Sequence, residues 1–483
     1  MKKLFLLALA AILLRGAEAD VKALVEAARN AWAVPGVAVA IVKDDKPLYL
    51  AGHGVRESGK ADPVTPHTAF QIASTTKAFT TTAMAMLVDE GKLAWDDPVR
   101  KHLDFFRLAD PHADALVTAR DLVTHRTGLP RHDVLWVRNG LSREELIRRI
   151  GLAKPAAPFR GIYQYQNLMF TSAGEVVGRA SGLGWDGFVQ QRILMPLGMM
   201  DTSTAYADML RHANMAMPHI KGKANPLQNY DNIGGAGTIA SSVDDLSRWV
   251  RMQLAGGVFE GKRLVSEKHL LATHEPQMVI QRTAASREMQ PEYTQSSYAM
   301  GWFVNHYRGE MLVMHSGSLS GYRALITMAP RLKLGIVILA NENGTNMNEA
   351  LTNTLLDEYL GLPKTRDWNA HMLQAVKNSE QKDVKEKQAR IDARAKDTKP
   401  SLPLTAYVGA YREPAYGEVN VSLQDGKLRA EWLRSKGEME HWHFDTWTIK
   451  ANGSLSDATA NFQLDDKGSP TRLLLLGQTF ERH

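Results

Sequence analysis

The N-terminal part of the chain alternates between helical and strand-like hydrophobic patterns. Apolar residues recur at helical spacing in residues 20–32, which predicts an amphipathic helix that Pro35 and Gly36 terminate. Residues 37–42 (VAVAIV) form a continuous β-favouring run, as expected of a strand that is covered on both faces. Residues 47–50 predict a second strand after a short turn. The pattern therefore begins with one helix and a pair of strands.

A long, mainly helical pattern occupies the middle of the chain, from about residue 74 to residue 271. Strand-like runs return at residues 311–314, 323–328 and 334–339. Strands thus flank a helical insertion from both ends of this region. The pattern predicts an α+β fold in which N- and C-terminal strands build one sheet and helices pack on it.

The composition changes after residue 376. Residues 377–403 are nearly all charged or polar and have no apolar stripe wide enough to bury, so they predict a solvated linker that is helical in part. From residue 404 to residue 483 the period becomes two: apolar residues alternate with polar ones around a hairpin turn at Asp425-Gly426. About 80 residues of short strands predict a small antiparallel barrel or sandwich.

Residues 1–19 have the pattern of an export signal. Lys2 and Lys3 precede an apolar stretch at residues 4–14, and residues 17–19 (AEA) offer a cleavage site between small residues. The stretch is too short to cross a bilayer as a helix, and we expect a periplasmic or secreted protein with no stable membrane insertion after cleavage. An N-terminal membrane anchor is the alternative, because Arg15 is an unusual charge so close to the cleavage site.

Composition excludes several classes of function. The formal charge of +6 is mild for 483 residues, and no Lys/Arg-rich run lies beside aromatic residues, so nucleic acid is not an expected partner. The absence of cysteine excludes disulfides, thiolate metal sites and a cysteine nucleophile. The sequence contains neither H-E-x-x-H nor a close cluster of metal ligands, so a metallohydrolase is disfavoured and no metal or cofactor is expected.

Three short motifs could together carry chemistry. Ser74 and Lys77 form an S-x-x-K motif at the start of a helical pattern, where residues three apart share a helix face. A base must take the proton of a serine hydroxyl before the oxygen can act as a nucleophile. Tyr165 and Asn167 supply a phenol that can transfer protons and an amide that can hold a substrate. Each motif is weak alone, since Ser379-x-x-Lys382 in the linker repeats the first spacing.

The third motif is His315-Ser316-Gly317, on the predicted strand that begins at residue 311. Gly317 allows backbone to approach a substrate closely. The next N–H group, of Ser318, could form an oxyanion hole with the N–H of Ser74.

In this order, the motifs resemble the penicillin-recognising serine hydrolases, which include class C β-lactamases, DD-peptidases, D-aminopeptidases and related esterases. The resemblance covers roughly residues 20–362. It extends to further stretches of sequence: residues 34–37 (VPGV), 70–74 (FQIAS), 121–129 (DLVTHRTGL), 196–199 (PLGM), 234–237 (GGAG) and 336–341 (IVILAN).

The resemblance implies a β-lactamase-like sheet flanked by helices, and it implies a role for each motif residue. Ser74 would accept the acyl group, Lys77 would be the adjacent positive charge, and Tyr165 would be the general base and then acid. Asn167 would orient Lys77 and substrate, and His315 would bind substrate, together with Gly317 and Ser318, at the position where many β-lactamases have lysine. Segment 125–128 is expected to brace a loop.

Histidine at position 315 is mostly neutral at pH 7 if its pKa is close to the usual 6.5 or so. The resemblance is therefore greater to D-amino-acid-specific peptidases and to esterases than to efficient β-lactamases. We expect an acyl-enzyme hydrolase of small amides, D-amino-acid-type peptides or esters. A class C-like β-lactamase and a non-hydrolysing penicillin-binding sensor are the alternatives.

The C-terminal segment has a resemblance of its own. Residues 407–411 (YVGAY) and the strands after them resemble the lipocalin-like β-domain of some family members, which implies a barrel. The expected organisation is a signal peptide (1–19), a catalytic domain (20–376), a charged linker (377–403) and a lipocalin-like barrel (404–483). The partner is expected to be a small molecule or short peptide, and the pattern does not indicate an oligomeric state.

Overall fold

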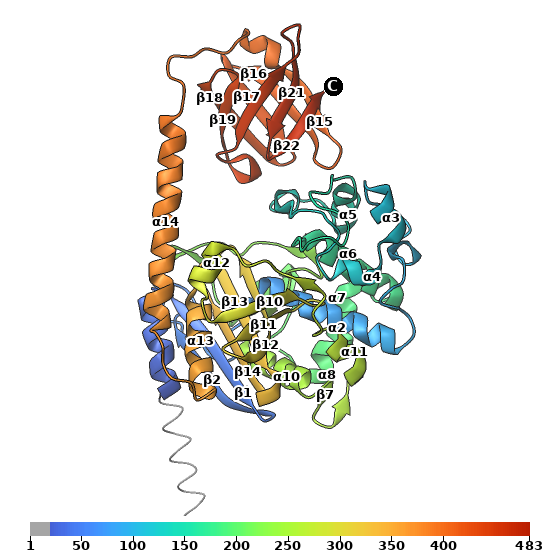
Figure 1. Cartoon of the computed structure of the whole chain (residues 1–483), viewed down its shortest axis with the longest axis vertical. Coiled ribbons are helices and arrows are strands. Elements are labelled where there is room, and N and C mark those ends of the chain that lie inside the picture. The colour runs from blue at the N-terminus through green and yellow to red at the C-terminus, as the bar shows by residue number, and fades with distance from the viewer. Residues whose placement is uncertain (1–19) are drawn as a thin grey trace, which may run out of the picture. The chain divides into compact units, whose positions relative to one another are not determined.

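The computed structural model describes residues 20–483, so the predicted signal peptide lies outside the described residues. One eight-stranded antiparallel sheet contains strands from both ends of the predicted catalytic segment (Figure 1). β1 pairs with β14 from Val37–Ala340 to Lys43–Leu334, which joins the N-terminal hairpin to strands almost 300 residues later. The predicted α+β fold is confirmed. In sheet order the strands are β2 (Lys46–Gly54), β1 (Gly36–Lys43), β14 (Leu334–Ala340), β13 (Tyr322–Ala329), β12 (Glu310–Leu319), β11 (Phe303–Tyr307), β10 (Tyr293–Tyr298) and β9 (Met278–Val279).

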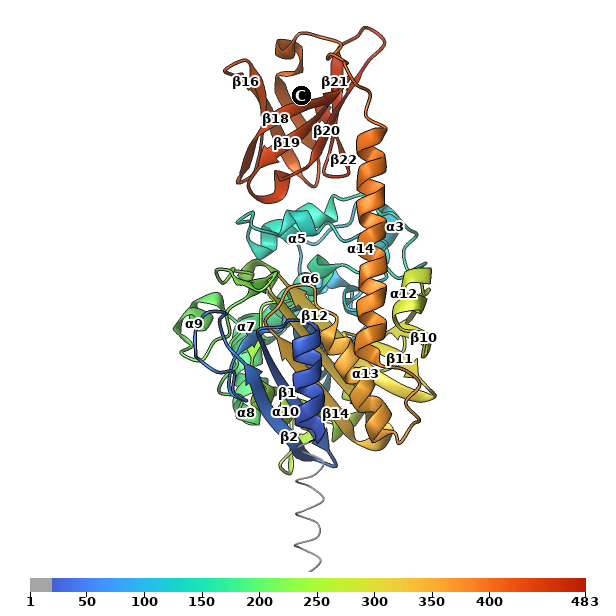
Figure 2. The same ribbon diagram turned by 90° about the vertical axis from the view of Figure 1, so that its left-hand side faces the viewer.

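Helices cover both faces of this sheet, which explains the uninterrupted apolar run of β1. Val37, Val39 and Ile41 belong to the core formed with the helix at residues 20–31 and with α13 (Met347–Tyr359); Figure 2 shows these two helices in front of the sheet. On the opposite face, α10 (Val243–Leu254) packs so closely that a Cβ on Gly335 would lie 2.2 Å from a methyl of Val250.

The middle of the chain is mainly helical, as its pattern predicts. Two helices in it carry predicted site residues at their N-terminal ends: α2 (Thr76–Asp89) and α6 (Asn167–Ser181). The other α-helices of the middle region are α3 (Pro111–Leu116), α4 (Ala119–Leu122), α5 (Arg143–Gly151), α7 (Gly184–Val189), α8 (Met195–Leu197), α9 (Tyr206–Arg211), α11 (Glu267–Ala272) and α12 (Ala284–Met289).

The start of the predicted linker is a helix. α14 runs from Trp368 to Asp392, beginning nine residues before the predicted boundary at residue 377. Trp368 and Met372 anchor its first turns in the core, whereas residues 378–392 are exposed. Lys, Glu, Gln, Ala and Arg are strong helix formers, so this stretch needs little burial to remain helical.

The C-terminal segment closes into an eight-stranded barrel, because β15 pairs with both β16 and β22. The predicted alternation is seen in its burial: Val419, Val421, Ala430 and Trp432 are buried and their polar neighbours face outward. The strands are β15 (Gly409–Glu413), β16 (Gly417–Gln424), β17 (Lys427–Trp432), β18 (Ser435–His443), β19 (Thr446–Ala451), β20 (Thr459–Leu464), β21 (Pro470–Leu475) and β22 (Gln478–Arg482).

The chain divides into two compact units whose boundaries differ from the predicted domains. The first unit contains residues up to 104, 116–128 and 157–377; the second contains 105–115, 129–156 and the barrel region 378–483. Within the second unit, Arg149 donates a hydrogen bond to the Tyr416 carbonyl (3.1 Å) and Tyr416 Oη lies 2.8 Å from Nδ1 of His132. Two segments of the predicted catalytic domain, one of which contains α5, thus group with the barrel.

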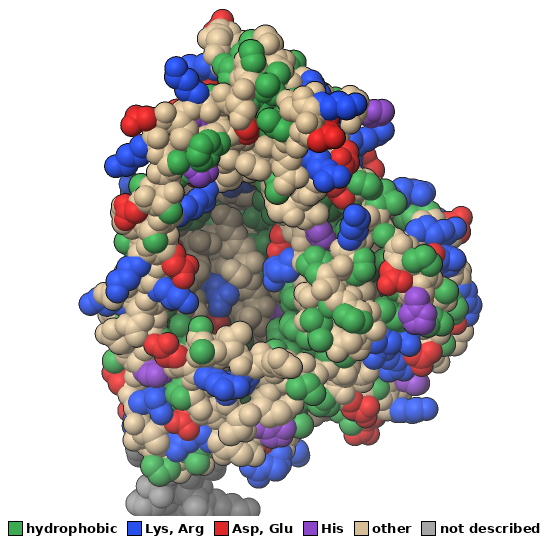
Figure 3. Space-filling model, turned by 45° about the horizontal axis from the view of Figure 1, so that its top comes forward, with side chains coloured by type: hydrophobic (Ala, Val, Ile, Leu, Met, Phe, Trp, Pro, Cys, Tyr) green, Lys and Arg blue, Asp and Glu red, His purple; other side chains and the backbone are tan. Residues whose placement is uncertain are grey.

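Charged side chains are distributed without a dominant sign. Figure 3 shows basic and acidic groups interspersed over the face in view, in keeping with the mild net charge. Among the described helices, none combines the length and the apolar character needed to cross a bilayer.

Candidate active site

Ser74 lies in a short 3₁₀ turn, Ala73–Thr75, that leads directly into α2. Ala73 has a φ of +51°, in the left-handed region that costs a non-glycine residue about 1–3 kcal/mol. Thr75 donates a side-chain hydrogen bond to the carbonyl of Ile72 (2.9 Å), which holds the turn. Side chains at Thr75 and Thr76 are buried while Ser74 keeps partial exposure. The turn therefore presents one hydroxyl at the N-terminal end of a buried helix.

Lys77 is fully buried, and its ammonium is surrounded by oxygen atoms. Nζ donates hydrogen bonds to Ser74 Oγ (3.0 Å), Asn167 Oδ1 (2.8 Å) and the carbonyl of Ala236 (2.9 Å). A lysine ammonium has three N–H donors, so this set of acceptors matches its charged form. A buried charge without such partners would be costly.

The segment that supplies Ala236 is held against α2. Thr80 donates a hydrogen bond to the carbonyl of Gly235 (2.8 Å), and the Ile239 N–H donates to Oγ1 of Thr76 (3.2 Å). These bonds fix the Gly-Gly-Ala-Gly stretch beside the helix that carries Lys77. The sequence singled out this stretch but gave no sign that its carbonyl would contact the lysine.

Tyr165 lies just before α6, and its ring is close to the lysine. Lys77 Nζ is 4.9 Å from the centre of the Tyr165 ring. Nδ1 of His125 accepts a hydrogen bond from the Gln166 N–H (3.0 Å), and the His125 ring centre is 4.2 Å from that of Tyr165. His125 thus braces the segment that carries the tyrosine, in agreement with the structural role expected for residues 125–128.

Strand β12 passes close to the turn that carries Ser74. A Cβ on Gly317 would lie 2.1 Å from the Ile72 carbonyl oxygen and 3.1 Å from Cβ of Ala73, so only glycine fits without displacing the backbone. Gly317 therefore lets β12 lie against the turn that carries Ser74. Ser318 follows on this strand and is exposed.

His315 lies on the same strand but is buried and hydrogen bonded at both ring nitrogens. Nε2 is 3.1 Å from the Tyr298 hydroxyl, and Nδ1 is 2.7 Å from the Ser316 carbonyl. Burial and the nearby charge of Lys77 lower the pKa of His315 to about 3, and burial raises the pKa of Tyr298 well above its usual value. Tyr298 therefore donates to Nε2, and Nδ1–H donates to the carbonyl. His315 is neutral and its ring is held in one orientation.

The ammonium group of Lys77 thus lies close to three other predicted residues: Ser74, Tyr165 and Asn167. Gly317 packs against the turn that carries Ser74. His315 is nearby, with its ring centre 6.5 Å from that of Tyr165. Tyr298, on the neighbouring part of the sheet, had no distinguishing motif in the sequence. It becomes visible only when β10 and β12 are placed in one sheet.

One group of described residues could hold a metal ion. His67, Asp201 and Asp244 bring possible ligand atoms within 4.8 Å of one another, and His67 Nδ1 is 2.9 Å from Asp201 Oδ2. His67 is exposed, and the group contains no residue of the predicted catalytic set. The arrangement also has a structural role, because Asp201 accepts a hydrogen bond from the Ser242 hydroxyl at the start of α10 (3.0 Å).

Comparison with known proteins places this geometry in a family. A family model described as Beta-lactamase matches residues 21–361, the segment that contains every residue of the site. The chain belongs to the beta-lactamase family. A second model, described as a domain of unknown function (DUF3471), matches residues 393–482, which include the barrel.

Relatives of this beta-lactamase family member include proteins named as hydrolases. Unguisins hydrolase ungD of Aspergillus violaceofuscus is 28% identical over 481 residues, covering 91% of this chain and 84% of that protein. Protein flp of Staphylococcus aureus (strain COL) is 27% identical over 322 residues, covering 64% and 60%. The family and these names support a hydrolase of the β-lactamase and penicillin-binding type.

A solved structure has the same fold. The octameric penicillin-binding protein homologue from Pyrococcus abyssi matches with a TM-score of 0.63 and 22% sequence identity. The match covers 96% of this chain and 99% of that one. This match shows a likeness of fold that extends over almost the whole chain.

Proposed function

We propose that the protein is a serine hydrolase that forms an acyl-enzyme on Ser74. The observation that carries this proposal is the 3.0 Å contact between Lys77 Nζ and Ser74 Oγ, made while two further oxygen atoms hold the ammonium in place. A serine hydroxyl in a structural role has no need of a buried cation aimed at its oxygen. A nucleophile gains from this arrangement, because the adjacent positive charge favours the alkoxide that forms during attack.

Tyr165 is the proposed proton carrier. The hydrogen bonds of Lys77 suit an ammonium, which has no lone pair with which to accept a proton. Tyr165 would act as a phenolate beside the Lys77 ammonium: it would take the proton of Ser74 as Oγ attacks the substrate carbonyl, and would return that proton to the departing amine or alcohol. In the second half, Tyr165 would take a proton from water as the water oxygen attacks the ester. The acid product then leaves and Ser74 regains its proton.

The backbone N–H groups of Ser74 and Ser318 are the proposed oxyanion hole. The close packing of Gly317 on Ile72 and Ala73 supports this assignment, because it sets the backbone of β12 beside the nucleophile turn. Negative charge that develops on the carbonyl oxygen would be stabilised there by donors that need no rearrangement.

The neutral form of His315 narrows the range of substrates that we propose. A neutral ring whose two nitrogens are hydrogen bonded offers no cation to a substrate carboxylate. Substrates without a carboxylate at that position fit best: amides of D-amino acids, peptides with an N-terminal D-residue, and small esters. A class C-like β-lactamase and a non-hydrolysing penicillin-binding sensor remain the competing proposals, and each would give a different experimental result.

Export to the periplasm or beyond the cell is part of the proposal, supported by the signal-like pattern of residues 1–19. The proposed partner is a small molecule or short peptide.

The experiment combines a substrate screen with intact-mass spectrometry. D- and L-amino-acid amides, p-nitrophenyl acyl esters and a chromogenic cephalosporin are each incubated with the protein, and mass is recorded over time. We expect turnover of an amide or ester with a transient mass increase that a Ser74→Ala variant lacks. Fast turnover of the cephalosporin alone would favour a β-lactamase, and permanent acylation would favour a sensor. Equal turnover by the Ser74→Ala variant would overturn the proposal.

A further inference from the structure

The wall of the C-terminal barrel opens between two neighbouring strands. β17 pairs with β18 only from Arg429–Glu438 to Trp432–Ser435, whereas β18 continues to His443 and pairs there with β19. Among the described strands, none therefore pairs with the outer half of β18 on its β17 side.

The chain that enters the barrel lies at this opening. Residues 398–404, here called the strap, are tied to the turn between β18 and β19. Ser401 donates from its backbone N–H and its hydroxyl to the carboxylate of Asp445 (2.8 and 2.7 Å). The Phe444 N–H donates to the Thr398 hydroxyl (3.0 Å). These hydrogen bonds hold the strap in place beside the gap between β17 and β18.

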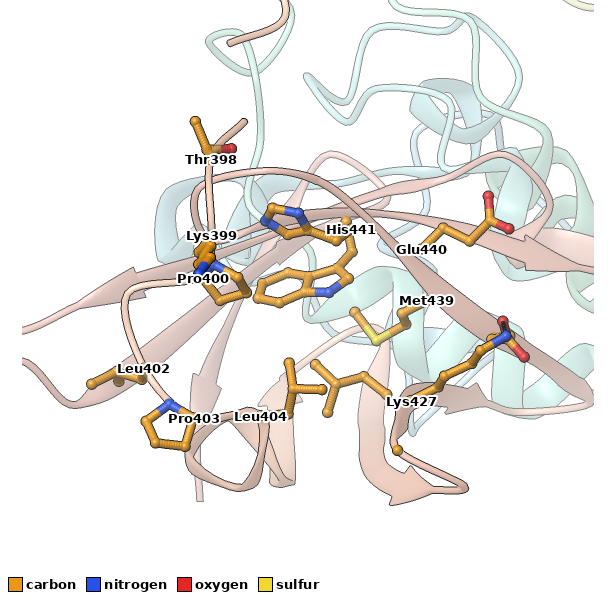
Figure 4. Close-up of a pocket in the computed structure, with 14 residues that line it drawn as sticks. Thr398, Lys399, Pro400, Leu402, Pro403, Leu404, Lys427, Met439, Glu440 and His441 are labelled. Atoms are coloured by element: carbon orange, nitrogen blue, oxygen red, sulfur yellow. Dashed lines mark hydrogen bonds and ion pairs between the residues drawn. The ribbon is translucent and has the colours of Figure 1, made fainter. Parts of the chain in front are cut away.

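A cavity of about 720 Å³ lies between the strap and the barrel strands, and all the residues that line it belong to one compact unit. Buried side chains of Leu428, Met439 and Trp447 line the cavity from the barrel strands. Figure 4 shows Lys399, Pro400, Leu402, Pro403 and Leu404 of the strap along one side, with Met439 and Lys427 across from them.

The apolar lining is backed by an aromatic cluster. The Trp447 ring centre is 4.9 Å from that of Tyr407 and 5.3 Å from that of Phe462, both in edge-to-face contact. The indole is therefore held rigidly, and a ligand could pack on it without first having to order it. The volume is in the range of pockets for small molecules, and the lining combines apolar side chains with polar and charged ones.

The charges at the rim favour an anionic ligand. Lys427 pairs with Glu438 (2.6 Å), and Glu440 pairs with Lys450 (2.5 Å). Lys399 is exposed and, among residues 20–483, makes no ion pair. After the paired charges are set aside, the rim presents one positive charge beside the apolar side chains of the lining.

We propose that this barrel cavity binds a small amphiphilic carboxylate, such as a medium-chain fatty acid. Its apolar body would pack on Trp447, Met439 and Leu428, and its carboxylate would bind Lys399. This binding site does not include Ser74, so the binding proposal can be tested separately from the proposed hydrolase activity.

The test measures binding of decanoic acid to the full chain by isothermal titration calorimetry, with decanol and decyltrimethylammonium for comparison. We expect saturable decanoate binding that Lys399→Glu weakens by about tenfold, the change that follows from roughly 1.4 kcal/mol. Lys396→Glu is the matched control: it makes the same charge change three residues earlier, outside the cavity lining, and should leave affinity within twofold.

A diazirine-labelled decanoate locates the site without relying on any variant. Cross-links should map by peptide mass spectrometry to residues 398–404, 426–428 or 438–447. Absence of decanoate binding, cross-links confined to other segments, or equal or tighter binding of the ammonium compound would each overturn the proposal.

Discussion

The chain contains two S-x-x-K sequences on helices, and their surroundings are opposite. Lys77 is fully buried and donates to three oxygen atoms, one of which belongs to Ser74. In α14, Ser379 is exposed, and the Lys382 side chain is 76% exposed with only a 3.8 Å contact to Glu386. Identical spacing thus produces a candidate catalytic pair in one place and a solvated helix face in the other. The difference lies in what the rest of the fold brings to the lysine.

The sharpest test of this contrast removes each serine hydroxyl. Ser74→Ala should lower the rate of acylation by at least about a thousandfold, because no other group supplies the nucleophile. Ser379→Ala should leave the rate unchanged. Ester hydrolysis and thermal unfolding of both variants provide the measurement. A Ser74→Ala variant that retains the parent rate would remove Ser74 from the mechanism.

The next largest effect is expected at the tyrosines. Tyr165→Phe should lower kcat by on the order of a hundredfold, as loss of a general base does. Tyr230 belongs to a Tyr-x-Asn sequence with the same spacing, but its hydroxyl donates to Gln228 (3.3 Å), so Tyr230→Phe serves as the control. A near-normal rate for Tyr165→Phe would show that Tyr165 is not the general base, and would assign that role to Lys77.

A smaller effect is expected when one hydrogen-bond acceptor or charged neighbour is removed from each of the two lysines. Asn167→Ala takes away a 2.8 Å hydrogen bond from a buried ammonium, and a charged hydrogen bond of this kind contributes about 1.5–3 kcal/mol. We expect kcat to fall by roughly ten- to a hundredfold with a folded protein. Glu386→Ala, which removes the neighbour of Lys382, should change neither kcat nor stability. Equal, small effects would mean that burial does not distinguish the two lysines.

Buried and exposed histidines extend the comparison to pH. His315 has a pKa of about 3 in the folded protein and should return to about 6.5 on unfolding. Between these values the unfolded chain binds a proton that the folded protein does not, so the free energy of unfolding falls as pH decreases. Between pH 6.5 and 4.5 this loss should be roughly 2–3 kcal/mol.

Denaturant unfolding at the two pH values measures this loss, and His315→Gln should reduce it. Exposed His67 is the control. Its hydrogen bond to Asp201 raises its pKa, so its contribution to stability is present at low pH and is lost as pH rises through that pKa. His67→Gln should therefore change the pH dependence only slightly and in the opposite direction. An unchanged slope in His315→Gln would contradict the buried, neutral state.

Much of the fold could be predicted because its signals are local. β1 and β14 are continuous apolar runs, and the barrel strands alternate with period two, so both were recognisable without coordinates. The grouping of residues 129–156 with the barrel was not predictable. It depends on contacts such as His132 with Tyr416, which involve residues 284 positions apart in the chain.

The site shows the same division. Fixed short spacings were the basis for predicting Ser74, Lys77, Tyr165 and Asn167, and the structure brings these four residues together. The Ala236 carbonyl and the Tyr298 hydroxyl were missed, because a backbone oxygen has no signature and Tyr298 has a role only through His315. His315 was expected to contact substrate, and its burial and two hydrogen bonds depend on neighbouring strands that the motif does not reveal.

The pairing of β1 with β14 has a consequence for how the molecule is made. The inner edge of the first strand acquires its neighbour only when residue 340 has left the ribosome, and closing so large a loop is slow. A nascent chain that already contains Ser74, Lys77 and Tyr165 therefore still lacks the strands that complete the sheet. In such a chain the candidate active site would not be assembled until synthesis of the first unit is nearly finished.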